Sequence, residues 1–547
     1  MLRRSLVTTV ALAAAAAVLA APAAAGQYVA PPRSGALFLF DGHGWGHGVG
    51  MSQWGAEGYA QHAYTFQQIL GAYYPGTSLG QTPVTTIRVL LAERKTLTIS
   101  SDQPITVTGS DGVQHTLPAG ATQLTPALTL AVDGAAAQPL EPPLTFVPSD
   151  GSYLTLGREY RGEIVVDVAG VRLEAINELP LEQYLAGVVP AEMPSTWLPA
   201  ALEAQAVASR SYAVATRRVA APFDVYADTR SQLYLGVSAE RPAATAAVAA
   251  TAGQVLFYGD QVATTYFSSS SGGRTQAAAD AWGGQSVPYL PSVPDPYDGI
   301  SPYHDWGPVP VPADALAHAL DVAGRVFDAR TALNPSKRVA QLDVSSLVRG
   351  RATTTPVPGS LAQGRLDLRS TWFRVAVLSL QPPQPNRAVP VGTKVKLTGV
   401  LRGVHGAVLQ QHSMHVPWSD LEKPRPAGRT RAFTVVVRPR ITTLYRLAVP
   451  AAAGGVVRIR VTPRVRLASA TTSGVEGRER PVLPGARVLV QQQPAAGSGR
   501  WRTVARGTVA TNGSFTVAGT LSPGPTRVVV APGHGYWPGA STAATVP

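Results

Sequence analysis

Short runs of alternating hydrophobic and polar residues fill much of the first half of the chain. Residues 86–91 (TIRVLL) and 163–168 (EIVVDV) are two of them, and Gly, Asp and Pro separate such runs. Alternation with a period of two is typical of strands with one buried face, and these turn-forming residues end them. We therefore expect a β-rich region over residues 84–190 and further strands near 253–268.

One segment has a strong helical pattern. Residues 196–220 carry Ala at positions 200, 201, 204, 206 and 208. Ala has the highest helix propensity, and Ser195 can cap the start of the helix. Small side chains allow close packing, so we expect a central core helix here. A shorter helix is expected over about 64–73, directly after an unusually Gly-rich segment.

The pattern changes after a Pro-rich stretch, QPPQP, which predicts a linker at residues 377–386. Beyond it, residues 428–449 and 511–532 resemble each other. In both, a polar turn leads into Phe-Thr-Val, then a Pro-containing turn, then an apolar strand. This repetition predicts two β-sandwich repeats of the immunoglobulin-like kind, over residues 387–450 and 451–547.

The expected fold class is therefore an α+β domain followed by two all-β immunoglobulin-like sandwich domains. The α+β domain covers residues 26–376. Within it we expect a Gly-rich segment at 26–80, the β-rich part at 84–190, and the core helix with its loops at 191–376.

The N-terminus predicts export. Two Arg residues precede an apolar run from Ser5 to Ala21, and small residues follow up to Ala25. A positive start, a short apolar stretch and an A-x-A site form a secretory signal peptide, here residues 1–25. An uncleaved membrane anchor is the alternative. Either way we expect a secreted protein, at the cell wall or the outer face of the membrane, and no nucleic-acid partner.

Composition and charge narrow the chemistry. The chain has 547 residues and no Cys, which excludes disulfides, thiol catalysis and Cys-ligated zinc. The net charge is +13 but unevenly spread: residues 381–547 hold 22 Lys and Arg against 4 Asp and Glu. The remaining 380 residues hold 46 − 22 = 24 basic and 33 − 4 = 29 acidic residues. The basic back could bind anionic wall polymers while the front does chemistry, or its arginines could only keep it soluble.

Three segments carry candidate chemistry. Residues 42–61 read GHGWGHGVGMSQWGAEGYAQ, residues 184–213 read YLAGVVPAEMPSTWLPAALEAQAVASRSYA, and residues 266–276 read YFSSSSGGRTQ. The third is followed by a D-x-x-D pair, Asp295 and Asp298.

Glu192, in the second segment, is the sharpest single candidate. It has apolar residues on both sides (VVPAEMP) and is expected immediately before a helix. Desolvation disfavours the charged form of a carboxyl and raises its pKa, which a proton donor at neutral pH requires. The alternative is an ordinary Glu stabilised by the dipole of a helix N-terminus.

The Gly-rich segment places His43 and His47 among glycines, which allow a ligand to approach the backbone closely. It could line a sugar site with Trp45 or Trp54 as a stacking face, or form a tight turn with solvated histidines. A metal site of His43, His47 and His62 rests on spacing alone, and no carboxylate completes a recognisable set. We expect no metal and no other cofactor.

The Ser/Gly run at 268–275 is either a binding loop or a flexible linker. No G-x-S-x-G element supports a serine hydrolase. On the helix after Glu192, Arg210 faces the site or forms a structural ion pair. The candidate substrate-binding residues are His47, Gln53, Gln205, Arg210, Tyr212, Ser270, Ser271, Gly272, Gly273 and Thr275.

Together the three segments resemble the SpoIID/LytB family, which comprises stage II sporulation protein D and the amidase enhancers. The resemblance covers about residues 36–376. In the familiar arrangement the GHGWGHGVGMSQWGA segment follows a stretch like LDLRSTWFRV, residues 366–375 here, whereas in this chain it comes first. The order looks circularly permuted. Because the termini of a domain often lie close together, such a permutation can keep the same site.

The resemblance implies peptidoglycan chemistry. Stage II sporulation protein D is a lytic transglycosylase acting on glycan strands without stem peptides, and its catalytic Glu corresponds to Glu192. The zinc site of some sporulation members includes Cys, so it does not carry over. LytB-type relatives are described as enhancers of wall amidases. A non-catalytic glycan-binding protein with an amidase partner is therefore the alternative.

The lytic reaction needs only one carboxyl, because the muramic acid 6-hydroxyl is the nucleophile, whereas hydrolytic glycosidases usually need two. Glu192 has no close carboxylate neighbour in the sequence. Folding could still bring Asp224 or Asp228 near it.

Overall fold

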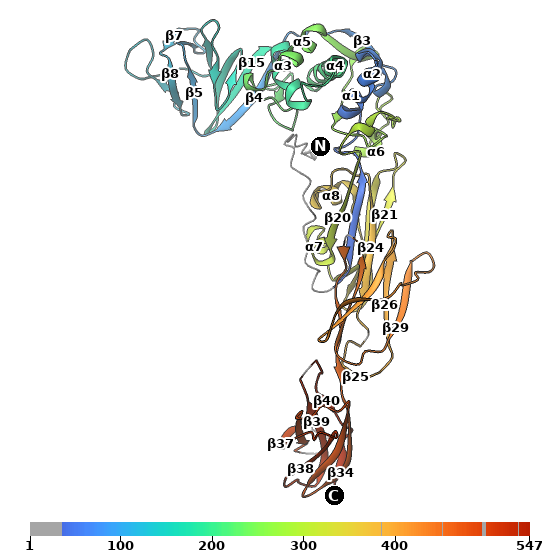
Figure 1. The fold of residues 1–547 in the computed structure, drawn as a ribbon. Coiled ribbons are helices and arrows are strands. Elements are labelled where there is room, and N and C mark those ends of the chain that lie inside the picture. The colour runs from blue at the N-terminus through green and yellow to red at the C-terminus, as the bar shows by residue number, and fades with distance from the viewer. Residues whose placement is uncertain (1–34, 384, 451, 495–498, 534) are drawn as a thin grey trace, which may run out of the picture.

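The structure is a computed structural model that describes residues 35–383, 385–450, 452–494, 499–533 and 535–547. The expected signal peptide, residues 1–25, lies outside the described residues. The molecule is elongated: a head lies at one end of a stalk of β structure, and the C-terminus lies at the far end of the stalk (Figure 1). Among the described residues, no helix is long and apolar enough to cross a membrane.

The outer part of the head is built on a seven-stranded sheet in the order β16-β4-β15-β14-β11-β6-β7. All neighbours are antiparallel except β16 and β4. The sheet contains β4 (Thr86–Arg94), β6 (Ile105–Thr108), β7 (Gln114–Leu117), β11 (Leu144–Pro148), β14 (Glu163–Ala169), β15 (Arg172–Pro180) and β16 (Val225–Tyr226). A smaller sheet contains β5 (Leu97–Ser101), β8 (Gly120–Leu124), β12 (Leu154–Thr155) and β13 (Glu159–Tyr160), and β9 (Thr129–Leu130) pairs with β10 (Gln138–Pro139).

The inner part of the head is helical. It contains α1 (Gln53–Gln61), α2 (Phe66–Tyr73), α3 (Leu181–Glu192), α4 (Pro199–Thr216), α5 (Pro242–Ala250), α6 (Ala278–Trp282), and the 3₁₀ turns Val237–Ala239 and Asp298–Ile300. The expected core helix is confirmed as α4, but Ser195 does not cap it, because the helix begins at Pro199 with Leu198 as its N-cap. The expected short helix is α2, whose start has a capping box of Thr65 and Gln68. The small sheet β3-β17-β18 covers them, with β3 (Ser78–Gln81), β17 (Gln254–Tyr258) and β18 (Gln261–Val262).

The N-terminal strand lies in the middle of a sheet whose other strands come much later in the sequence. Strand β1 (Leu37–His43) lies between β20 (Asp305–Pro312) and β24 (Phe373–Gln381) and is antiparallel to both. Gly42 is opposite Phe373, and the amide of His43 donates to the carbonyl of Trp372 at 2.9 Å. The start of the Gly-rich segment is therefore paired with the LDLRSTWFRV stretch, although the two are far apart in the sequence.

A three-stranded sheet and two helices complete the upper stalk. They are β21 (Arg325–Leu333), β22 (Val339–Val348), β23 (Arg351–Pro358), α7 (Ala313–Ala319) and α8 (Gly359–Arg365). Phe38, Phe40 and Phe373 lie in the core between them. Strand β1 continues from this core toward the head, so the Gly-rich segment is anchored to the core of the upper stalk.

The expected linker at 377–386 begins inside a buried strand. Strand β24 runs to Gln381 in the sheet β20-β1-β24-β26-β29. Val377 packs into the upper-stalk core, whereas Leu378 and Leu380 pack into the core of the next β unit. Because successive strand residues point to opposite faces, β24 is apolar on both sides and joins the two units rigidly. The Pro residues come only after the strand has ended.

This next unit, the first β unit, pairs two sheets around a core that includes Leu37, Leu397 and Tyr445. It contains β25 (Val389–Pro390), β26 (Val395–Arg402), β27 (Val408–Ser413), β28 (Val416–Glu422), β29 (Ala432–Val437), β30 (Thr443–Val449), β31 (Ala452–Ala453), β32 (Val457–Ile459) and β33 (Val461–Thr462). It borrows β1 and β24 from the upper stalk, so it is larger than residues 387–450.

The second β unit has its own core, including Val488, Phe515 and Val528. It contains β34 (Arg464–Thr471), β35 (Gly474–Arg480), β36 (Arg487–Gln492), β37 (Arg502–Thr508), β38 (Ser514–Ala518), β39 (Gly524–Ala531), β40 (Gly539–Ala540) and β41 (Ala544–Val546). The amide of Trp537 donates to the carbonyl of Val461 at 2.8 Å. This bond holds the two units end to end.

The same cluster of three side chains occurs in both β units. In each, an Arg Nε donates to the Gln Oε1 directly across the strand pair at 2.9 Å, and the Arg lies over a Trp ring. The members are Trp418, Gln410 and Arg446 in the first unit and Trp501, Gln491 and Arg527 in the second. The repetition expected from the sequence therefore extends to side-chain contacts.

Candidate active site

Glu192 is the last residue of α3, and its side chain is half-buried. Its carboxylate accepts a hydrogen bond from the amide of Leu233 at 3.1 Å and another from the side chain of Gln53. Burial raises the pKa of Glu192, and the two hydrogen bonds oppose that rise. The net direction is upward, as a proton donor requires.

The dipole alternative for Glu192 does not apply. The sequence predicted a position just before a helix, but α3 continues through Pro190 and ends at Glu192. Val188 and Val189 are buried and hold this last turn in the core, and Pro194 prevents a longer helix. At a helix C-terminus the dipole disfavours a carboxylate, so it adds to the effect of burial.

The Gly-rich segment places Gln53 next to Glu192. Ser52 caps α1: its hydroxyl accepts from the amide of Gly55 at 3.1 Å and donates to Asp298 at 2.7 Å. Gly50, at φ +71°, packs so closely on the carbonyl of Tyr266 that a Cβ would clash. The loop geometry thus fixes the start of α1, and with it Gln53.

His47 lies in the same segment but faces aromatic rings. Its ring centroid is 5.5 Å from that of Trp282 and 6.1 Å from that of Tyr266. Its Nδ1 accepts from the amide of Val49 at 3.0 Å. Burial, with the positive charge of Arg338 second, lowers the pKa of His47 to about 4. His47 is therefore neutral at neutral pH.

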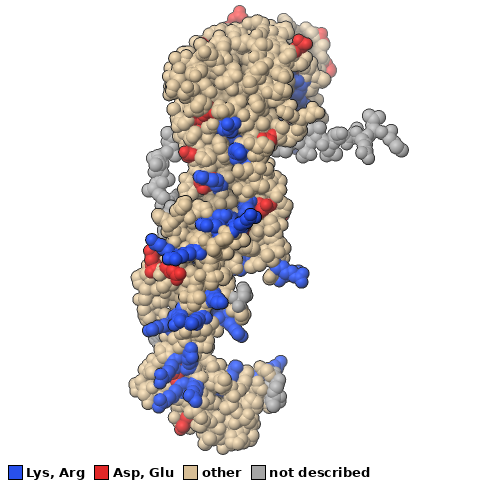
Figure 2. Space-filling model, turned by 90° about the vertical axis from the view of Figure 1, so that its right-hand side faces the viewer, with Lys and Arg blue, Asp and Glu red and all other residues tan. Residues whose placement is uncertain are grey.

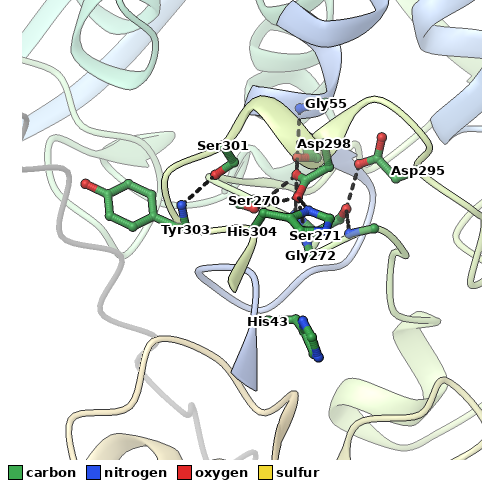
Figure 3. A network of polar contacts seen from close by, with 12 residues as sticks. His43, Gly55, Ser270, Ser271, Gly272, Asp295, Asp298, Ser301, Tyr303 and His304 are labelled. Carbon is green, nitrogen blue, oxygen red and sulfur yellow. Dashed lines mark hydrogen bonds and ion pairs between the residues drawn. The ribbon is translucent and has the colours of Figure 1, made fainter. Parts of the chain in front are cut away.

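The Ser-rich loop is tied to buried carboxylates, which corrects its expected role in substrate binding. Asp298 accepts from the hydroxyl of Ser270 at 2.8 Å and from the amides of Ser271 and Gly272 at 2.9 and 3.0 Å (Figure 3). The Ser271 hydroxyl donates to Asp295 at 2.6 Å. Because these hydroxyl and amide groups already donate to carboxylates of the protein, they are not free to bind a ligand. The loop therefore supports the structure around the site.

The other two members of that loop also have internal roles. The amide of Gly273 donates to the Ser271 hydroxyl at 3.1 Å. The Thr275 side chain is buried and bonds the carbonyl of Pro291 at 3.2 Å. Neither is placed to hold a sugar.

Of the three candidates on α4, only Tyr212 lies near Glu192. Burial and, to a smaller extent, the Glu192 charge raise the pKa of Tyr212 to about 12. Arg210 is fully buried and pairs with Glu182 at 2.5 Å. Of its two expected roles, the structure therefore supports the structural ion pair and not substrate binding. Gln205 is also buried, and its amide donates to Ser209 at 2.9 Å.

The two aspartates that folding might have brought near Glu192 have arginine partners instead. Asp224 pairs with Arg88 at 3.0 Å, and Asp228 pairs with Arg230 at 2.7 Å. No carboxylate of the described chain is among the groups that shift the pKa of Glu192.

The suggested histidine metal site is not formed. His43 lies 2.5 Å from Asp305, and His62 lies 2.8 Å from the carbonyl of Gly58, while His47 faces Tyr266. Across the described ranges, no group of three or more His, Asp or Glu side chains could hold a metal ion.

Several residues of this region were missed from the sequence. Asp298 and Asp295 were noted only as a D-x-x-D pair, although they organise the Ser-rich loop. Burial raises the pKa of Asp295 to about 7. Arg338 is fully buried, and its Nη2 donates to the carbonyl of Ser271 at 3.0 Å. Nothing in the surrounding sequence marks Arg338, because its partners are far away in the chain.

Comparison with known proteins agrees with this geometry. Residues 169–258, which include Glu192 and all of α4, match the family model described as SpoIID, Stage II sporulation protein. Over this segment the chain is similar to the SpoIID family. The match covers the second motif, whereas the Gly-rich segment lies outside it, in keeping with the altered order of segments.

Three proteins that this chain is similar to come from Bacillus. Stage II sporulation protein D of Bacillus subtilis (strain 168) is 36% identical over 146 residues, covering 24% of this chain and 42% of the relative. Stage II sporulation protein D of Bacillus amyloliquefaciens is 31% identical over 219 residues, 36% of this chain and 61% of the relative. The amidase enhancer of Bacillus subtilis is 40% identical over 115 residues, 21% of this chain and 15% of the relative. The chain thus spans less than two thirds of each of these SpoIID relatives.

Proposed function

We propose that this protein is an exported peptidoglycan lytic transglycosylase with Glu192 as its acid and base. The observation that carries the proposal is the environment of Glu192: a half-buried carboxyl with a raised pKa, held by Leu233 and Gln53. No nearby carboxylate in the described chain complements it as a second catalytic group. One carboxyl suffices for the lytic reaction but not for ordinary glycoside hydrolysis.

The reaction uses Glu192 twice. The protonated carboxyl donates its proton to the glycosidic oxygen as the bond from that oxygen to C1 of muramic acid breaks. The muramic acid 6-hydroxyl then attacks C1, and the Glu192 carboxylate accepts the hydroxyl proton. The products are a 1,6-anhydro-muramic acid end and a free 4-hydroxyl on the other fragment. No water is consumed, and Glu192 ends as it began.

The test is mass spectrometry of the products that the protein releases from purified, peptide-free glycan strands. The wild type should release 1,6-anhydro ends, and Glu192→Gln, which is nearly isosteric, should release none. Glu163→Gln is the matched control, because Glu163 is also a half-buried Glu whose pKa is raised by burial, but it lies on β14. Equal product from wild type and Glu192→Gln would exclude the mechanism.

The second candidate is a glycan-binding enhancer of a wall amidase, which the relative named amidase enhancer favours. In this case the protein binds glycan strands, releases no anhydro product alone, and increases the turnover of an added amidase. The same product assay, run with and without an amidase, separates the two functions.

Residues 381–547, the part of the stalk that holds the two β units, are proposed to keep the protein on anionic wall polymers. Lys and Arg lie along one face of the stalk, with few Asp or Glu between them (Figure 2). On the β34–β35 ribbon, Arg464 is directly opposite Arg480 and Arg466 directly opposite Arg478, all four exposed. Like charges placed directly opposite each other destabilise a sheet. An anionic partner bound to these arginines would offset that repulsion. The two β units are proposed to be immunoglobulin-like domains.

Wall binding of the full chain should weaken as salt rises, because the contact is between charges. Arg466→Gln with Arg478→Gln should release the protein at lower salt than the wild type. Arg349→Gln with Arg351→Gln removes the same charge from the exposed β22–β23 hairpin and is the control. Wall binding that does not change with salt would refute the proposal that this region binds wall polymers. Release of both double variants at the same salt concentration would refute it as well.

A further inference from the structure

A pocket of about 490 Å³ lies where the upper stalk meets the first β unit. Its wall on the first β unit includes Leu444 of β30 and Arg458 of β32, which are directly opposite each other and share a face of the sheet. Its wall on the upper stalk includes Arg325, the first residue of β21. Leu380, also in the lining, lies in β24, the strand that joins the two units. The pocket is therefore built from separate parts of the chain.

One end of the pocket is fixed by a close backbone contact. Gly35, which lines the pocket, lies just before β1, and Gly455 packs so closely on its carbonyl that a Cβ at 455 would clash. Leu380 and Val457 of the lining also belong to the core of the first β unit. Since side chains in a packed core have fixed positions, the pocket has a defined shape.

Three arginines line this pocket without a counter-charge. They are Arg325, Arg458 and Arg460, and no Asp or Glu is part of the described lining. In the part of the chain that the structure describes, the side chains of Arg325 and Arg458 have no hydrogen bond or ion pair. The Arg460 guanidinium lies 4.4 Å from the centroid of the Trp537 ring and has no acidic partner among the described residues. The protein itself therefore does not neutralise the positive charge around this pocket.

Other arginines nearby on the stalk do have a partner. Asp328, also on β21, pairs with Arg402 at 2.5 Å and with Arg330 at 3.2 Å. Arg325, by contrast, is half-buried, and burial lowers its pKa with no carboxylate to oppose the effect. A cation that has lost part of its hydration without gaining a partner is stabilised by an anion that enters the pocket.

The arginines and the walls together indicate the kind of anion. Guanidinium groups donate paired hydrogen bonds to the oxygens of phosphates and carboxylates. A phosphate ester offers three oxygens and a charge of about −1.5 to −2 to several arginines, whereas a carboxylate offers two oxygens and a single charge. Leu380, Leu444 and Val457 supply apolar walls, which suit the apolar face of a sugar or polyol. The volume is also in the range of pockets for small organic ligands.

We propose that this pocket binds a phosphorylated sugar or polyol, with its phosphate on the arginines and its carbon skeleton against the apolar walls. The pocket lies on the stalk, and no step of the lytic reaction at Glu192 uses it. Arg325 also lies outside residues 381–547, for which wall binding is proposed. The same phosphate chemistry occurs on wall polymers, on lipid headgroups and on free sugar phosphates, and only the first of these sources rests on the proposed function.

The test measures binding of glucose 6-phosphate to the full chain, beside glucose, inorganic phosphate and glucuronate. The wild type should bind glucose 6-phosphate at least about threefold more tightly than each of the other three, because only this probe combines a phosphate with a sugar ring. Arg325→Gln with Arg458→Gln should weaken its binding by at least about tenfold. Neither side chain has a partner to lose in the described chain, so this variant should fold.

Two further variants separate a built pocket from general attraction between charges. Arg325→Lys with Arg458→Lys keeps the charge but loses the paired donors, so affinity for glucose 6-phosphate should fall by about 3- to 10-fold. Arg349→Gln with Arg351→Gln removes two exposed arginines of the β22–β23 hairpin and should change the affinity by less than about twofold. Wild-type affinity in the Lys variant would overturn the inference, and so would an equal loss in the β22–β23 control. Equal binding of glucuronate or of inorganic phosphate would overturn the assigned class of ligand.

Binding to purified wall and to vesicles containing phosphatidylglycerol identifies the source of the phosphate. If Arg325→Gln with Arg458→Gln loses affinity for the wall, a wall polymer carries the ligand, and if it loses affinity for the vesicles, a lipid does. A loss for glucose 6-phosphate alone assigns the pocket to a free sugar phosphate. A wild type that binds glucose 6-phosphate but not the wall refutes the proposed wall binding and leaves the pocket standing. A wild type that binds the wall but not glucose 6-phosphate refutes the pocket.

Discussion

The side chain of Gln53 hydrogen-bonds the carboxylate of Glu192, which joins the Gly-rich segment to the end of α3. Gln53 precedes the β-rich part of the head in the sequence and Glu192 follows it. Strand β1 and helix α1 bring the two residues together. Strand β1, which leads into the Gly-rich segment, is paired on both edges, with β20 and β24. Through this contact Gln53 positions the carboxyl of Glu192.

Gln53→Leu should move the pH dependence of the lytic reaction. The lost hydrogen bond stabilised the charged carboxylate, so the pKa of Glu192 rises further. Glu192 must be protonated to act as the acid, so activity should persist to higher pH. We expect the alkaline limb of kcat/KM to move up by about one pH unit.

Gln61→Leu is the control for this variant. Gln61 is on the same helix, and its amide donates to Glu57 at 3.0 Å instead of to Glu192. Its pH profile should match the wild type. A Gln53→Leu enzyme with lower activity but an unmoved alkaline limb would show that Gln53 acts on something other than Glu192.

Arg210 should matter for folding rather than for glycan binding. Its guanidinium is fully buried, with Glu182 on one side and the carbonyls of Gln254 and Val248 on the other. Arg210→Met removes one donor from each of these acceptors, although Glu182 still accepts from the amide of Gly253 and the carbonyl of Val248 still accepts from Thr251. Part of Glu182 can still reach water. We expect a loss of about 2–4 kcal/mol in the free energy of unfolding.

The measurement is denaturant unfolding of the full chain beside glycan affinity at low temperature. Arg217→Met, on the residue that ends the same helix, is the control. If Arg210→Met keeps wild-type stability but loses glycan affinity, the residue contacts substrate after all.

Asp295 and His47 should give opposite pH dependences of stability. The folded pKa of Asp295 is about 7 and its ordinary value 3.8, so the folded state holds its proton more tightly. Stability from Asp295 is present at low pH and is lost as pH rises from about 4 to 7. The effect has a maximum slope of about 1.4 kcal/mol per pH unit. Burial is the main cause, with Asp298 raising the pKa and Ser271, Tyr73 and His304 lowering it.

For His47 the sign is reversed. Its folded pKa is about 4 and its ordinary value 6.5, so the unfolded state binds the proton more tightly. Stability from His47 is present above pH 6.5 and is lost as pH falls toward 4. Relative to wild type, Asp295→Asn should gain stability as pH rises through this range, and His47→Gln should lose it. Unfolding at several pH values checks both, and parallel curves would contradict both shifts.

Much of the fold follows from local sequence signals. The alternating runs predicted the strands of the head, the Ala-rich segment predicted α4, and the two similar stretches predicted the repeated β units. The failure at residues 377–386 has a physical reason. Strand β24 is apolar on both faces because it separates two cores, so its pattern does not show where one unit ends.

The site was predictable only in part. Glu192 stood out because its apolar neighbours imply burial, and Gln53 was included with the Gly-rich motif. The serines and glycines of 270–275 looked like ligand donors because the sequence does not show that Asp298 and Asp295 already use them. Arg338 had no sequence signal, since long-range packing alone gives it its neighbours.

The repeated Trp–Arg–Gln cluster should contribute equal coupling energies in the two β units. Arg446 lies 4.0 Å from the centroid of the Trp418 ring, and Arg527 lies 4.2 Å from that of Trp501. A half-exposed cation–π contact of this kind is worth about 0.5–1 kcal/mol. Double-mutant cycles of Arg446→Ala with Trp418→Ala, and of Arg527→Ala with Trp501→Ala, should each give a coupling in that range. The cross pair Arg446→Ala with Trp501→Ala joins side chains of different units and should be additive. Couplings near zero within both units would mean that the repeated contacts are only a consequence of strand register.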